Sequence, residues 1–163
     1  MGFYEIAEDQ PAVENLQRFT PPKASGFTYL PSFWVKIALA GGAQNAFAVS
    51  KQNPFGEDVI IIRAIVDVTT LSATASAVLD VDVDGDGATG GDDIFDGIPI
   101  GSGDTAPKIF DSLNGTDNGT NGEGKSWQWD KAGGTNDYIT AQILAAAGAA
   151  LAGDLYLECI PAE

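Results

Sequence analysis

The sequence predicts an all-β protein: an antiparallel β-sandwich or jelly roll of about seven to eight strands, preceded by an extended N-terminal arm. Three observations lead to this fold class. Short segments alternate apolar and polar residues with the period of two that is typical of a half-buried strand. No segment shows the 3.6-residue period of a long amphipathic helix. Pro11, Pro21, Pro22 and Pro31 interrupt the first part of the chain before the alternation begins.

The predicted strands follow the arm, which takes up residues 1–32. They differ in length but share the alternation of faces. Leu79 and Val81, for example, share one face of a predicted strand, whereas Asp80 and Asp82 share the other. The segments with this pattern are 33–39, 44–50, 57–68, 75–83, 126–131, 137–144 and 154–160.

Three connections in the predicted body, residues 33–163, carry predictions of their own. Residues 40–43 (Ala-Gly-Gly-Ala) separate the first two strands and predict a β-hairpin. Residues 84–124 hold eleven glycines and predict a long acidic loop. Short apolar islands within it are expected to pack the loop against the body. This stretch far exceeds the usual connection of about 4–6 residues. The Ala-rich segment 145–153 contains two glycines and is predicted to be a loop rather than a helix.

Charge is spread unevenly along the chain. Residues 1–56 carry four acids and four bases, so the formal net charge of −15 comes entirely from residues 57–163. A strongly acidic body disfavours nucleic acid and anionic membrane surfaces as partners, because both are recognised by clustered Lys and Arg. The pattern indicates an uncharged arm joined to a soluble, self-repelling body, which is more typical of an assembly component than of a free enzyme.

Several residue types needed for common chemistry are missing. The sequence contains no histidine, and its single cysteine, Cys159, lies in an alternating apolar segment where a buried and inert thiol is expected. The sequence shows no nucleophile elbow, phosphate loop or Cys–His pair, so we do not expect an enzyme. It also shows neither a secretory signal nor a membrane-spanning run, which favours synthesis in a cytoplasm.

One acidic segment has the spacing of a calcium loop. Asp82, Asp84 and Asp86 are followed by a glycine, and Asp93 falls at the twelfth position. Clustered carboxylates repel one another until a cation arrives, so calcium is a reasonable ligand. A predicted strand precedes the loop, however, whereas an EF-hand needs a helix on each side. A solvated acidic turn is the favoured interpretation, and calcium in a β-type loop is the alternative.

Trp127 and Trp129 share one face of a predicted strand and allow two interpretations. In a sandwich interior such residues pack in the core, which is the favoured interpretation. On an exposed face they would form a platform for sugars. The second interpretation, combined with the acidic loop, gives an alternative function: a calcium-dependent module that binds carbohydrates or surfaces.

Several segments, in their order and spacing, resemble a family of structural proteins from tailed bacteriophages, the capsid-associated head decoration or cement proteins. No single motif is specific, and the likeness covers roughly residues 50–160. The arm is longer and more aromatic than the family leads us to expect, and residues 80–86 are more acidic. The matching stretches are Gln-Asn-Pro-Phe at 52–55, Ala-Ile-Val-Asp-Val-Thr-Thr at 64–70, Asp-Ile-Phe-Asp-Gly at 93–97, Asn-Gly-Glu-Gly-Lys-Ser at 121–126, Tyr-Ile-Thr-Ala at 138–141 and Ala-Ala-Leu-Ala-Gly at 149–153.

The resemblance implies a β-sandwich without catalytic residues that binds the major capsid protein and stabilises the lattice on the virion surface. It also implies self-association, with a trimer as one form. A structural role in the tail or baseplate is a second hypothesis within the same class. Ordering an extended arm costs about 1–2 kcal/mol per residue, so large apolar anchors must offset it. The expected anchors are Phe27, Tyr29, Phe33 and Trp34.

Overall fold

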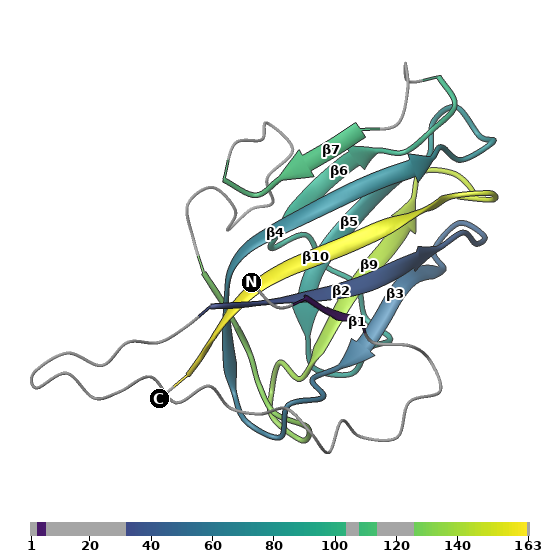
Figure 1. The fold of residues 1–163 in the computed structure, drawn as a ribbon. Coiled ribbons are helices and arrows are strands. Elements are labelled where there is room, and N and C mark those ends of the chain that lie inside the picture. Colours follow the sequence, from purple (N-terminus) through teal and green to yellow (C-terminus); the bar gives the residue numbers. More distant parts are fainter. Residues whose placement is uncertain (1–2, 6–31, 104–107, 114–125, 163) are drawn as a thin grey trace, which may run out of the picture.

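The structure, a computed structural model, describes residues 3–5, 32–103, 108–113 and 126–162. It confirms the predicted fold class. The described strands form two sheets that pack face to face as a β-sandwich (Figure 1). Within these ranges no helix is long and apolar enough to cross a lipid bilayer.

The first sheet, called sheet A here, contains six of the described strands. β10 lies at its centre between β2 and β4, which Figure 1 shows clearly. The strands of sheet A in spatial order are β1 (Phe3–Glu5), β2 (Phe33–Ala40), β10 (Ala152–Pro161), β4 (Val59–Thr70) and β7 (Lys108–Asp111), with β8 (Trp127–Trp129) also paired to β4.

The second sheet, sheet B, contains four strands joined by antiparallel pairs. Its inner face meets that of sheet A through a core of aliphatic side chains and tryptophans. Val35 of sheet A and Leu79 of sheet B, for example, are both fully buried. The strands of sheet B in spatial order are β3 (Phe47–Gln52), β9 (Tyr138–Leu144), β5 (Val78–Asp84) and β6 (Phe95–Pro99).

The predicted hairpin around residues 40–43 is wrong. β2 pairs with β10 in sheet A, whereas β3 pairs with β9 in sheet B, so the connection crosses from one sheet to the other. Asn45 adopts a positive φ of 67°, and its N–H donates to the carbonyl of Ile143 at 2.7 Å. The chain therefore turns a corner of the sandwich here rather than folding back on its own sheet.

The long loop predicted at 84–124 is also more structured than expected. Its apolar islands contribute to two strands, β6 and β7, at the edges of the two sheets. Each island is too short to show a period, but each finds a long partner strand, β5 or β4. Residues 145–153 form a loop, as predicted, until β10 begins at Ala152.

β4 divides its outer edge between two partners. Its first residues pair with β8 and its later residues pair with β7. Between the two lies a register shift against β10, where Ile62 is the extra residue on β4. Such a bulge bends and twists a strand locally. Here it lies between the β8 pairing and the β7 pairing.

The predicted arm falls almost wholly outside the described residues. Within the range 1–32 the structure describes residues 3–5, which form β1, and Ser32, which directly precedes β2. β1 pairs in parallel with β2 of the same chain. Residues 3–5 therefore lie at the edge of sheet A.

Candidate functional site

The two outer faces of the sandwich differ in chemistry. On β2, Val35 and Ile37 point into the core, so Trp34 and Lys36 point outward from sheet A and are half-buried. The same alternation on β10 turns Tyr156 outward. We call this surface the sheet A face. Its principal residues are Trp34, Lys36, Arg63, Ile65 and Tyr156, with Ile109 and Leu113 at its β7 edge.

Strand register places these residues in rows. Trp34 lies opposite Glu158, which in turn lies opposite Arg63. In the next row Lys36, Tyr156 and Ile65 lie side by side. Neighbouring side chains on one face of a sheet lie within reach of one another. The sheet A face is therefore assembled from three strands that are far apart in the sequence.

Each cation on this face is paired with an aromatic ring and a carboxylate. The guanidinium of Arg63 lies 6.0 Å from the ring centroid of Trp34. The ammonium of Lys36 lies 5.9 Å from the ring of Tyr156 and 3.2 Å from a carboxylate oxygen of Asp154. Desolvation and then the charge of Asp154 raise the pKa of the Tyr156 hydroxyl, so this group stays neutral at physiological pH.

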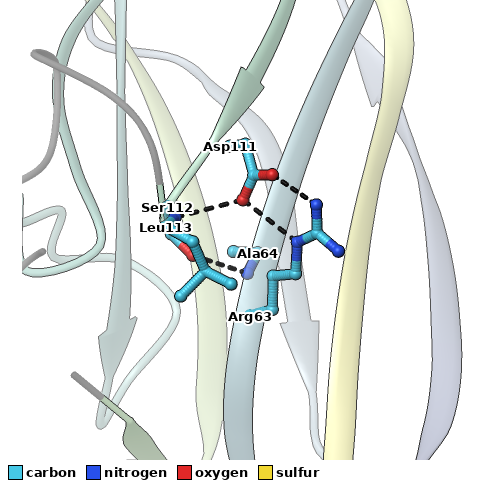
Figure 2. Close-up of polar contacts among 5 residues, drawn as sticks. All are labelled: Arg63, Ala64, Asp111, Ser112 and Leu113. Carbon is cyan, nitrogen blue, oxygen red and sulfur yellow. Dashed lines mark hydrogen bonds and ion pairs between the residues drawn. The ribbon is translucent and has the colours of Figure 1, made fainter. Parts of the chain in front are cut away.

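Arg63 also fastens β7 to β4 (Figure 2). Its Nε donates to Asp111 Oδ1 at 3.1 Å, and its Nη2 donates to the other carboxylate oxygen, so the pair is bidentate. This hydrogen bonding is the main reason that the pKa of Arg63 is raised. Both side chains remain partly open to solvent, so the pair contributes about 0.2–1 kcal/mol to stability.

The residue after Asp111 continues the attachment. Ser112 is fully buried; its N–H donates to the carbonyl of Ala64 at 2.9 Å, and its hydroxyl accepts the N–H of Ala64 at 2.9 Å (Figure 2). The Leu113 N–H donates to Asp111 Oδ1 at 3.1 Å. These bonds fasten β7 to β4, while Ile109 and Leu113 stay 70% and 42% exposed, the large apolar side chains most open to solvent in the described part of the chain.

The outer face of sheet B is acidic. Asp80, Asp82 and Asp84 point outward from β5, because Leu79, Val81 and Val83 point into the core. Burial raises the pKa of Asp80, and the charges of Asp96 and Asp92 add to the effect. No lysine or arginine lies on β5 or β6.

The connection between β5 and β6 lies across this acidic face. A Cβ on Gly87 would fall 2.4 Å from the Tyr138 ring, and one on Gly90 would fall 2.2 Å from the Gln142 side chain. Both side chains belong to β9. Thr140, between them on the same strand, is only 1% exposed although it faces outward. Glycine at these positions therefore lets the loop lie flat on the sheet.

The four candidate calcium ligands make different contacts in the structure. Asp82 lies beneath the loop, where burial first and the charge of Asp93 second raise its pKa to about 6. Asp84 accepts the N–H of Gly85 at 2.6 Å. Asp86 accepts the N–H groups of Ala88 and Thr89 at 2.8 and 2.7 Å, and these bonds lower its pKa.

The backbone of Asp93 also makes a contact, because its carbonyl accepts the indole N–H of Trp127 at 3.2 Å. Across the described ranges, His, Cys, Asp and Glu side chains form no group of three or more that is arranged to hold a metal ion. The carboxylates instead close turns in the loop and line the face beneath it.

The predicted arm anchors divide into two pairs. Phe27 and Tyr29 lie outside the described residues. Phe33 packs edge-on against Phe55 at 5.1 Å between ring centroids, which ties it to the rim of its own core. Trp34 lies on the sheet A face beside Arg63.

Trp127 and Trp129 belong to the core, as the favoured interpretation predicted. They are 7% and 0% exposed, and the Trp129 indole donates to the carbonyl of Asp137 at 3.0 Å. Neither ring can serve as a sugar platform. Cys159 is buried as well, and desolvation raises the pKa of its thiol to about 12.

The sequence analysis missed Arg63, Tyr156 and Ile109 as functional candidates. One signal for Arg63 was available, because it is one of only four bases after residue 56 and interrupts an apolar strand. Ile109 gave no signal, since an island of two apolar residues does not show which one is exposed. A scan against protein-family models, a search of curated proteins and a search of solved structures each found no match.

Proposed function

We propose that this chain is a structural subunit that docks through the sheet A face onto a larger protein assembly, and that it has no catalytic role. The form suggested by the family resemblance is a bacteriophage decoration or cement protein, placed on the capsid surface and bound to the major capsid protein. The composition of one face and the contacts within it support the proposal.

The observation that carries the proposal is the meeting of Trp34, Arg63 and Tyr156 on one face. Tryptophan, tyrosine and arginine are the residue types most enriched where protein interfaces concentrate their binding energy. Scattered exposed aromatics would mean little. Here the two rings lie under cations at 6.0 and 5.9 Å, and Ile109 and Leu113 extend the apolar surface at the β7 edge.

The contacts within the face favour binding. Salt bridges and cation–π contacts already restrict Arg63 and Lys36, and the Ser112–Ala64 bonds attach β7 to β4. Side chains that are ordered before binding lose less entropy on binding, at roughly 0.5–1.5 kcal/mol for each immobilised side chain. Such a face suits a subunit that must remain attached under mechanical load.

The acidic sheet B face is better suited to contact with solvent than to contact with the assembly. Its loop covers the strands, and its carboxylates favour water or cations over an apolar partner. We therefore place sheet A toward the assembly and sheet B toward solvent.

The test measures co-sedimentation of the purified chain with assembled major capsid protein. Ile109→Asp places a charge in the proposed contact and should weaken binding by at least about tenfold. The matched control is Ala88→Asp, which adds the same charge at an exposed residue of the sheet B loop. It should leave binding within about twofold of the parent chain. Equal binding by the parent and both variants would overturn the proposed face.

A further inference from the structure

β1 is an unusual element of this sandwich. It pairs in parallel with β2, with Phe3 opposite Trp34, Tyr4 opposite Val35 and Glu5 opposite Lys36. The other pairs between described strands are antiparallel. The pairing covers three residues of an eight-residue strand and lies at the edge of sheet A.

The connection between β1 and β2 is much longer than the geometry requires. Because Glu5 lies opposite Lys36, it is three residues along the strand from Phe33. Three residues span about 10 Å, and neighbouring strands are about 5 Å apart, so these two ends are roughly 11 Å apart. The chain uses the 27 residues between Glu5 and Phe33 to join them. A parallel crossover needs only about a dozen.

That length also reaches a neighbouring molecule. Twenty-seven residues can span up to about 90 Å. A body of about 130 residues has a radius of gyration of roughly 14 Å, so two touching bodies have their centres about 35–40 Å apart. The β2 edge of an adjacent copy therefore lies within range of β1.

Charge decides which part of the chain can approach a second copy. The net charge of −15 comes from residues 57–163, so two bodies repel each other. Residues 1–56 are neutral, and β1 belongs to them. A link between copies through β1 avoids the repulsion that a contact between bodies would meet.

We propose that copies of this chain are linked by exchange of β1, in which residues 3–5 of one copy add to β2 of a second copy in the register seen within one chain. The bonds are identical in the two arrangements, so exchange costs no contacts. Main-chain hydrogen bonds at the sheet edge hold the incoming strand. The inference goes beyond docking on the sheet A face, because it concerns association of the chain with itself.

A cysteine pair tests the exchange in the full-length chain. Glu5→Cys and Lys36→Cys are introduced together, since paired strands place these Cα atoms about 5 Å apart, within disulfide range. The native Cys159 is buried and does not compete. After mild oxidation without any partner protein, covalent dimers and larger species on a non-reducing gel are expected, with the disulfide between positions 5 and 36 identified by mass spectrometry. Each single variant, oxidised separately, is the control for other linkages.

Two outcomes overturn the proposal. A monomer that contains the disulfide between positions 5 and 36 would show that β1 pairs only within its own chain. A failure to form that bond in either arrangement would show that β1 does not occupy the β2 edge at all. As a second measurement, deletion of residues 1–5 should convert the oligomer to monomer in light scattering, while the far-UV spectrum of the body is retained. Both measurements are made without a docking partner, so a failed docking test would leave this result standing.

Discussion

Asp82 should make the protein less stable at neutral pH than at mildly acidic pH. Its carboxyl lies beneath the β5–β6 loop, where a Cβ on Gly91 would fall 2.1 Å from Oδ2. Burial is the main cause that raises its pKa from 3.8 to about 6, and the charge of Asp93 is the second. The folded protein therefore holds a proton on Asp82 through a pH range in which the unfolded chain has released it.

The sign of the effect follows from proton linkage. Where the folded state binds more protons than the unfolded state, the free energy of unfolding falls as pH rises. The window runs from about pH 3.8 to about pH 6, and the full loss is present above it. Two pKa units correspond to about 3 kcal/mol. Because Asp82 is only half-buried, solvent screening reduces this to about 1–2 kcal/mol.

Asp82→Asn removes the charge and keeps the shape. An asparagine oxygen can still accept the Val83 N–H, which Asp82 accepts at 2.7 Å. Urea unfolding is followed by tryptophan fluorescence at pH 4.5 and pH 7.5 with a chelator present. About a third of the effect is already present at pH 4.5, so relative to the parent chain the variant should gain about 0.7–1.3 kcal/mol between these two pH values. The control Asp96→Asn, at an exposed carboxylate, should gain much less. Equal gains in the two variants, or a smaller gain for Asp82→Asn, would refute the reasoning.

Three further predictions concern the core, the β7 attachment and the loop. Ser112→Ala leaves the buried Ala64 N–H without its acceptor and should lower the free energy of unfolding in urea by about 1–3 kcal/mol. Hydrogen exchange at Ala64 should become faster, and unchanged exchange would contradict this role of Ser112. Cys159 should not react with a thiol reagent at pH 8 until the protein unfolds, because burial raises its pKa to about 12; rapid labelling of folded protein would disprove its burial. Gly85→Ala would place a Cβ 2.3 Å from the Thr135 carbonyl oxygen and should destabilise by about 1–3 kcal/mol, so a fully stable variant would argue against this close contact.

Much of the fold could be predicted from the sequence. Alternation identified β2, β4, β5, β9 and β10, because side chains on a strand point to opposite faces every second residue. The same local rule placed Trp127 and Trp129 together, and their burial confirms the core interpretation. Glycines in the β5–β6 connection could be counted, although their positions against Tyr138 and Gln142 could not be foreseen.

The sequence by itself determined the fold class, the main strands and the neutral-then-acidic layout of charge, since each depends on neighbours along the chain. Sheet membership required the tertiary structure, and the hairpin prediction failed because alternation does not say which strand a segment will pair with. The sheet A face also required it. Trp34, Arg63 and Tyr156 come from β2, β4 and β10, and only the register of those strands brings them together.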